Sequence, residues 1–116
     1  MINMAAENYA ISLLKLQRYA EAKSVLTKTI PVVQRTLGKK DVTTLKMRWV
    51  YAGTLYEDPD ATLDDLREAV TTLEDAARIA RRVLGGANPT TVGIELRLRN
   101  ARAALSARET PSPGSA

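Results

Sequence analysis

Apolar side chains recur every three to four residues along most of the chain, the spacing that places them on one face of an α-helix. The pattern predicts helices at about 3–16, 19–36, 42–57, 62–83 and 89–108. The short turns between these segments group them into a hairpin at 3–37, a second hairpin at 41–84 and a capping helix at 88–108. We therefore expect one all-α domain spanning residues 1–108, with about five helices.

The ends of the predicted helices carry stop and start signals. Gly38 and Gly85 stand where a helix C-terminus favours a left-handed residue. Asp41 and Asn88 can each accept a hydrogen bond from a free N–H of the helix that follows. The segment from Thr62 to Asp65 resembles a capping box, with Asp in place of the usual Glu. These signals support the hairpin boundaries.

Three features need a separate interpretation. Pro31 falls inside the second predicted helix, where it cannot donate a hydrogen bond to the Thr27 carbonyl, so we expect it to kink or split that helix. Trp49 has helical spacing with other apolar residues, which favours a core or inter-repeat contact over a ligand anchor. Residues 109–116 are rich in Pro, Ser and Gly, so we expect a disordered tail.

One motif occurs twice. Leu-Gly-x-x-x-x-Thr-Thr spans 37–44 and returns at 84–91, a spacing of 47 residues. Self-similarity at a period of roughly 20–50 residues is typical of repeat architectures. Each copy ends one helical pattern and begins the next, so the motif separates structural units.

The repeated residues resemble tetratricopeptide repeats, specifically the kinesin-light-chain type. The matching residues are Asn8-Tyr9-Ala10, Tyr19-Ala20-Glu21-Ala22, Leu37-Gly38 with Asp41 and Thr44, and Leu84-Gly85 with Asn88-Pro89 and Thr91. The resemblance implies an α-solenoid, a right-handed stack of antiparallel helical hairpins. It also implies a non-enzymatic scaffold whose first helices line a concave face that binds a peptide or protein segment.

Superposing the repeats on this pattern identifies the residues expected to face the partner. They are Asn8, Ser12, Lys46, Val50, Thr54 and Arg97. The family has an asparagine at one position of each repeat. The first repeat keeps it as Asn8, whereas Val50 and Arg97 occupy the equivalent positions of the later repeats. The net charge of +4 favours an acidic partner.

Composition removes several classes of function. The chain has no Cys and no His, so thiol chemistry and the commonest general base and metal ligand are absent. The acidic turn beginning at Asp58 alternates oxygen side chains, but Leu63 and Ala69 replace the Gly and Glu that a calcium loop requires. We expect no enzyme activity, no metal and no cofactor.

The expected location is the cytoplasm. No apolar run reaches the roughly 18 residues that a membrane span needs. The first residues lack the basic and apolar regions of a signal peptide.

Two alternative functions stay open. The chain begins in mid-pattern, which is compatible with a structural fragment of a longer repeat array or with a homo-oligomer formed through exposed repeat ends. Nucleic-acid binding would use an arginine-rich face, formed by Arg78, Arg81, Arg82, Arg97, Arg99 and Arg102. Aromatic residues for base stacking are not interleaved there, which disfavours the second alternative.

Overall fold

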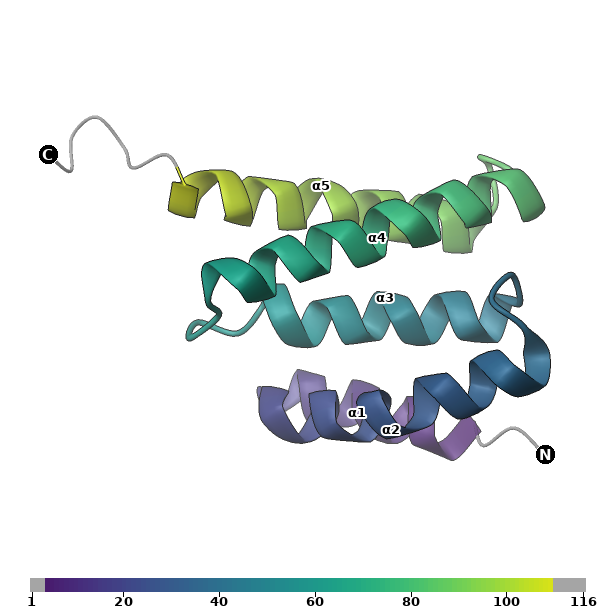
Figure 1. The fold of residues 1–116 in the computed structure, drawn as a ribbon, viewed down its shortest axis with the longest axis horizontal. Coiled ribbons are helices and arrows are strands. Elements are labelled where there is room, and N and C mark those ends of the chain that lie inside the picture. The colour runs from purple at the N-terminus through teal and green to yellow at the C-terminus, as the bar shows by residue number, and fades with distance from the viewer. Residues whose placement is uncertain (1–3, 110–116) are drawn as a thin grey trace, which may run out of the picture.

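The computed structural model describes residues 4–109 and places them in five α-helices, with no strand in that range (Figure 1). The helices are α1 (Met4–Lys15), α2 (Tyr19–Leu37), α3 (Val42–Tyr56), α4 (Leu63–Val83) and α5 (Pro89–Glu109). The predicted all-α class is confirmed. Glu109 belongs to α5, and the predicted disordered tail otherwise lies outside the described residues.

Each helix packs against its neighbour in the chain, and α3 also contacts the other two odd-numbered helices. α1 contacts α3, and α3 contacts α5. α2 packs on α1 and α3, while α4 packs on α3 and α5. Figure 1 shows consecutive helices lying side by side with short turns between them. The central position of α3 makes it part of both halves of the molecule.

The predicted start signals are confirmed in atomic detail. The Asp41 carboxylate accepts a hydrogen bond from the Thr43 N–H at 2.8 Å, and the Asn88 side-chain oxygen accepts one from Thr90 N–H at 2.9 Å. Thr62 and Asp65 bond reciprocally to each other's backbone N–H, which is a capping box. Each cap satisfies donors that a helix N-terminus leaves without partners.

The backbone of α2 differs from the sequence prediction at Gly38, and it shows no split at Pro31. Gly38 has φ 94° and ψ 161°, so its φ requires glycine but its ψ lies outside the left-handed helical region. α2 continues through Pro31 as one helix, so Pro31 does not split it. The Pro31 side chain is exposed, and Leu26 and Val33, buried on either side of it along the chain, hold the helix against its neighbours.

The turn between α1 and α2 uses an unusual residue. Gln17 has φ 60°, and it is the one non-glycine residue of the described part with positive φ. Its N–H donates to the Leu14 carbonyl at 2.9 Å, while Arg18 N–H donates to the Leu13 carbonyl at 2.8 Å. This pair of bonds is a Schellman motif, which normally takes glycine at the left-handed position.

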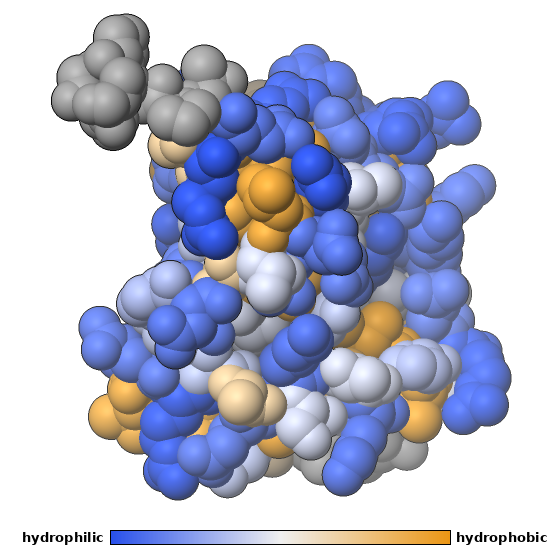
Figure 2. All heavy atoms as spheres, turned by 60° about the vertical axis from the view of Figure 1, so that its left-hand side comes forward, coloured by the Kyte–Doolittle hydropathy of each residue, from blue (hydrophilic) through white to orange (hydrophobic). Residues whose placement is uncertain are grey.

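The buried side chains form two clusters that meet at α3. The C-terminal core is drawn from α3, α4 and α5, and consists of Leu45, Ala52, Leu55, Ala69, Leu73, Ala76, Ala77, Ala80, Ile94, Leu98 and Ala101. The N-terminal core is drawn from α1, α2 and α3, and consists of Ala10, Leu26, Val33 and Met47. Figure 2 shows apolar areas in both the upper and the lower part of one face, separated by polar side chains. No helix of residues 4–109 is long and apolar enough to cross a membrane.

Candidate functional site

A groove with a volume of about 410 Å³ runs across α1, α3 and α5. Its walls are formed by Glu7, Ile11, Leu14, Lys15, Lys46, Trp49, Val50, Gly53, Glu57 and Arg97. The α1 and α3 members recur every three or four residues, so each helix presents one continuous stripe to the groove. We call this site the odd-helix groove.

The floor of the odd-helix groove is apolar. Ile11 and Leu14 come from α1, and Val50 and Gly53 come from α3. Gly53 permits close approach of the two helices, because a Cβ there would lie 3.0 Å from Glu57 Oε2 and 3.1 Å from Leu14 Cδ2. A larger residue would push into the space between α1 and α3. The floor thus offers an aliphatic surface for a partner side chain.

Trp49 connects the floor to α5. A Cβ added at Gly93 would lie only 2.4 Å from the Trp49 ring, so the ring packs directly on the α5 backbone. The Arg97 guanidinium lies 5.9 Å from the ring centroid, within the range of a cation–π contact. The expected inter-helix contact of Trp49 is therefore present, and the same side chain also lines the groove.

Glu7 is a buried carboxylate at the α1 side of the groove. It is 7% exposed, and its Oε2 atom has no hydrogen-bond partner. Burial raises the pKa of Glu7, while the positive charge of Lys46 acts in the opposite direction. No carboxylate oxygen of Glu7 lies within ion-pair distance of Lys46 among the described residues. The Oε2 atom of Glu7 is consequently an acceptor without a hydrogen-bond partner in the folded chain.

The rim of the groove is predominantly basic. Lys15, Lys46 and Arg97 contribute cations, and Glu57 contributes one exposed acid. Exposed charges interact weakly in water, but they bias the sign of the partner and speed its approach. The rim therefore favours a ligand that carries negative charge beside its apolar part.

Three of the six residues predicted to face a partner line the groove. These are Lys46, Val50 and Arg97. Asn8 and Ser12 are exposed on α1 but do not line it. Thr54 is 3% exposed and its hydroxyl donates to the Tyr51 carbonyl at 2.6 Å, so it has no surface for a partner and we leave it out of the site.

On α1, the stripe that lines the groove differs from the stripe that the sequence predicts to face a partner. The structure brings Glu7, Ile11 and Leu14 there, one residue away from the stripe that holds Asn8 and Ser12. A signal was present in the sequence. Glu7 lies four residues before Ile11 and seven before Leu14, so an acid shares a face with two large aliphatic residues.

Much of the arginine-rich face is neutralised within the chain. Arg81 binds Glu95 through two hydrogen bonds of 2.9 and 3.1 Å. Arg102 binds Glu74 at 2.9 Å, which joins α5 to α4. These pairs reduce the positive charge that a nucleic acid would meet. Among residues 4–109 there is no group of three or more His, Cys, Asp or Glu side chains that could hold a metal ion.

Comparison of the chain with protein-family models, with curated proteins and with solved structures finds no match. The class that the geometry establishes is an all-helical protein of five helices over residues 4–109, with a groove across its odd-numbered helices.

Proposed function

We propose that this protein is a non-enzymatic interaction module of the tetratricopeptide type, a right-handed stack of hairpins that binds a peptide segment in the odd-helix groove. The observation that carries the proposal is the position of the groove on α1, α3 and α5. These are the first helices of successive hairpins, which line the concave face in the family that the sequence resembles. The volume of about 410 Å³ lies within the range typical of ligand sites, roughly 300–1,000 Å³.

The chemistry of the groove suggests one kind of segment. An aliphatic side chain fits the floor between Leu14 and Val50, where it would be removed from water. An acidic residue beside it would face Lys46 and Arg97 on the rim. We therefore propose an aliphatic anchor flanked by an acidic residue as the recognised pattern.

Selection of peptides from a random display library tests this proposal, with the wild-type protein as bait. We expect enriched peptides to combine a Leu, Ile or Val with Asp or Glu. Their affinity, measured by calorimetry, should fall by about tenfold in Lys46→Glu, as expected for the loss of one charge-assisted contact.

Lys28→Glu is the matched control, because it makes the same charge reversal on the exposed face of α2, outside the groove. Peptides that lose equal affinity for both variants respond to overall charge and do not bind in the groove. The proposal would also be overturned if no enriched peptide bound Lys46→Glu more weakly than the wild type.

Self-association stays a separate prediction. Tyr9 and Leu16 lie seven residues apart on α1 and in the turn that follows, and they are 54% and 66% exposed. Light scattering of the wild type and Leu16→Ser over a concentration series tests it. A mass equal to one chain at every concentration would exclude a homo-oligomer.

A further inference from the structure

A second, smaller pocket lies between the α2–α3 turn and the C-terminal part of α4. Its volume is about 220 Å³. It is lined by Lys39, Lys40, Asp75, Arg78, Ile79, Arg82 and Val83. We call it the basic pocket. None of its residues lines the odd-helix groove.

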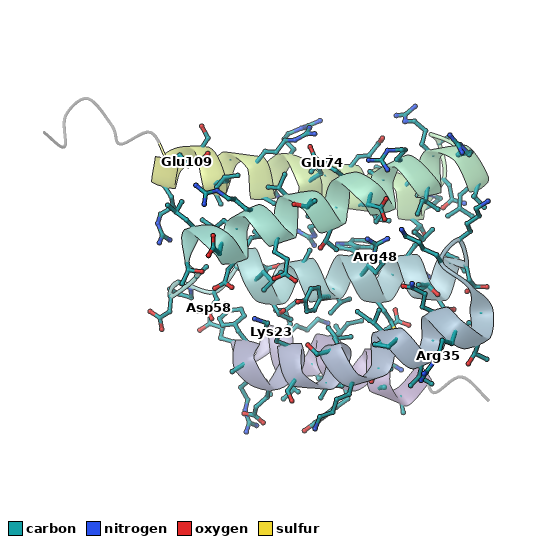
Figure 3. The ribbon with its side chains drawn as sticks, viewed as in Figure 1. Lys23, Arg35, Arg48, Asp58, Glu74 and Glu109 are labelled. Carbon is teal, nitrogen blue, oxygen red and sulfur yellow. The ribbon has the colours of Figure 1, made fainter. Side chains whose placement is uncertain are left out.

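A single carboxylate, that of Asp75, organises the cations of this region. It lies 3.1 Å from Lys39 Nζ, 2.8 Å from Arg48 Nη1 and 3.0 Å from Arg78 Nη1. Figure 3 shows Arg48 lying between α3 and α4. The Arg48 Nη1 atom is within ion-pair distance of Asp75 but lacks the alignment of a hydrogen bond. Burial raises the pKa of Asp75, but the combined effect of Lys39 and Arg48 outweighs it and holds the pKa below its ordinary value.

One carboxylate cannot neutralise all the cations around it. Lys40 and Arg82 also line the pocket, and neither has an acidic partner within ion-pair distance among residues 4–109. The five cations Lys39, Lys40, Arg48, Arg78 and Arg82, with Asp75, carry a net charge of +4. This equals the formal net charge of the whole chain, so the remaining charged residues cancel one another.

Stabilisation of the α4 macrodipole does not account for all the positive charge around the basic pocket. Cations near the C-terminus of α4 do complement its macrodipole. That effect acts within the last turn, which contains Arg82, whereas Lys39 and Lys40 come from another element. Mutual repulsion among cations that share one pocket is unfavourable. A bound anion would relieve it.

The pocket is not uniformly polar. Ile79 and Val83 lie four residues apart on α4 and form an apolar wall beside the cations. Val83 is 47% exposed, so a large part of its apolar surface is open to solvent. A ligand with both an anionic and an apolar part would match the two sides of the pocket.

We propose that the basic pocket binds a small organic phosphate, with the phosphate group against Lys39, Lys40 and Arg82 and the organic group against Ile79 and Val83. Lysine and arginine side chains are common phosphate ligands because they combine positive charge with several hydrogen-bond donors.

Titration of the ¹⁵N-labelled protein with phenyl phosphate and with inorganic phosphate tests the proposal by NMR. We expect saturable shifts of the amides of Lys39, Lys40 and the last two turns of α4, with phenyl phosphate binding more tightly than inorganic phosphate. The affinity should fall at least about tenfold in the double variant Lys40→Gln/Arg82→Gln, since two charge-assisted contacts to the phosphate are removed.

The matched control is Lys28→Gln/Arg108→Gln, which removes two exposed charges from outside the pocket. Equal weakening by the two double variants would show diffuse attraction and overturn the proposal. So would the absence of saturation, or equal affinity for the two phosphates. In a further experiment, binding of the protein is measured to phosphatidylcholine vesicles with and without phosphatidylserine. Binding to the anionic vesicles without binding of phenyl phosphate would assign the pocket to a lipid surface and also overturn it.

Discussion

The two ends of the helix stack differ in how firmly they are held. At one end, α4 and α5 are helices of 21 residues each, and the C-terminal core to which they contribute contains eleven buried residues. The α1–α2 hairpin has a first helix of 12 residues, and the N-terminal core contains four. Ion pairs such as Arg81–Glu95 and Arg102–Glu74 also join α4 to α5, whereas none joins α1 to α2 among the described residues.

This difference matters because the odd-helix groove lies across the boundary. α3 and α5 belong to the firmly held part, and α1 supplies the opposite wall. Proteins open locally where few apolar contacts hold an element in place. We therefore expect the groove to have one rigid wall and one that can move away from it, so that ligand binding and docking of α1 stabilise each other.

The largest expected effects come from the same substitution made in each core. Leu73 and Leu26 are both fully buried, and Leu→Ala in a core typically costs about 2–5 kcal/mol. We expect Leu73→Ala to lower the free energy of global unfolding by that amount in urea titrations. Leu26→Ala should instead open α1 and α2 locally.

Native-state hydrogen exchange distinguishes the two results. In Leu26→Ala the faster exchange should be confined to amides of α1 and α2, with α4 and α5 still protected. Equal acceleration across all five helices in both variants would show one cooperative unit and contradict the comparison.

A somewhat smaller effect is expected at the contact between α3 and α5. A Cβ at Gly93 would lie 2.4 Å from the Trp49 ring, so Gly93→Ala should force the ring or α5 to move, at a cost of about 1–3 kcal/mol. Trp49 fluorescence should change together with the urea midpoint. If Gly93→Ala had the same fluorescence and stability as the wild type, the α3–α5 wall of the groove would adapt easily and would not be rigid.

The turn of the N-terminal hairpin offers a way to strengthen the weaker half. Gln17 has φ 60°, which costs a residue with a side chain about 1–2 kcal/mol, whereas Gly38 and Gly85 occupy positive φ elsewhere in the chain. Gln17→Gly should therefore stabilise α1–α2 by up to about 1 kcal/mol, after the greater entropy of glycine in the unfolded chain is counted. Slower hydrogen exchange in α1 is the expected readout, and unchanged exchange would show that the turn is not what limits docking of α1.

The residues that determine helix ends were readable from the sequence, because their effects are local. Asp41, Asn88 and the Thr62–Asp65 capping box act on backbone groups within three residues, so their roles follow from neighbouring letters alone. The local rule for Pro31 predicts a kink or a split, and the structure shows no split of α2. The buried residues Leu26 and Val33 keep α2 continuous in spite of the missing N–H.

The groove was only partly predictable, because it depends on the rotation of each helix about its axis. On α3 the predicted Lys46 and Val50 do line the groove, while Thr54, four residues further on, is buried. On α1 the neighbouring stripe faces the groove instead of Asn8 and Ser12. Helical spacing identifies stripes, but which stripe faces which neighbour is settled by side chains from distant parts of the chain, such as Gly93 against Trp49.

The smallest expected effect concerns Glu7 and depends on pH. Its pKa is raised in the folded protein by burial, so the folded state holds the proton to higher pH than the unfolded state does. The stability contributed by Glu7 is therefore fully present below its ordinary pKa of 4.5 and is lost as pH rises through the folded value. Glu7→Gln should match the wild type at acid pH and exceed it in thermal stability near neutral pH. A loss of stability near neutral pH would mean that the Glu7 charge is needed to hold α1 in place.

The central claim, that the odd-helix groove is the binding surface, is tested most directly by its own tryptophan. Trp49 is the one tryptophan of the chain and lines the groove, so its fluorescence reports on that site without labelling. A selected peptide should change the Trp49 emission saturably in the wild type. The same titration of Gly53→Leu, checked to be helical by circular dichroism, should show little change because the added side chain fills the floor. A peptide that binds both proteins equally well and leaves the Trp49 emission unaltered would place the binding surface elsewhere.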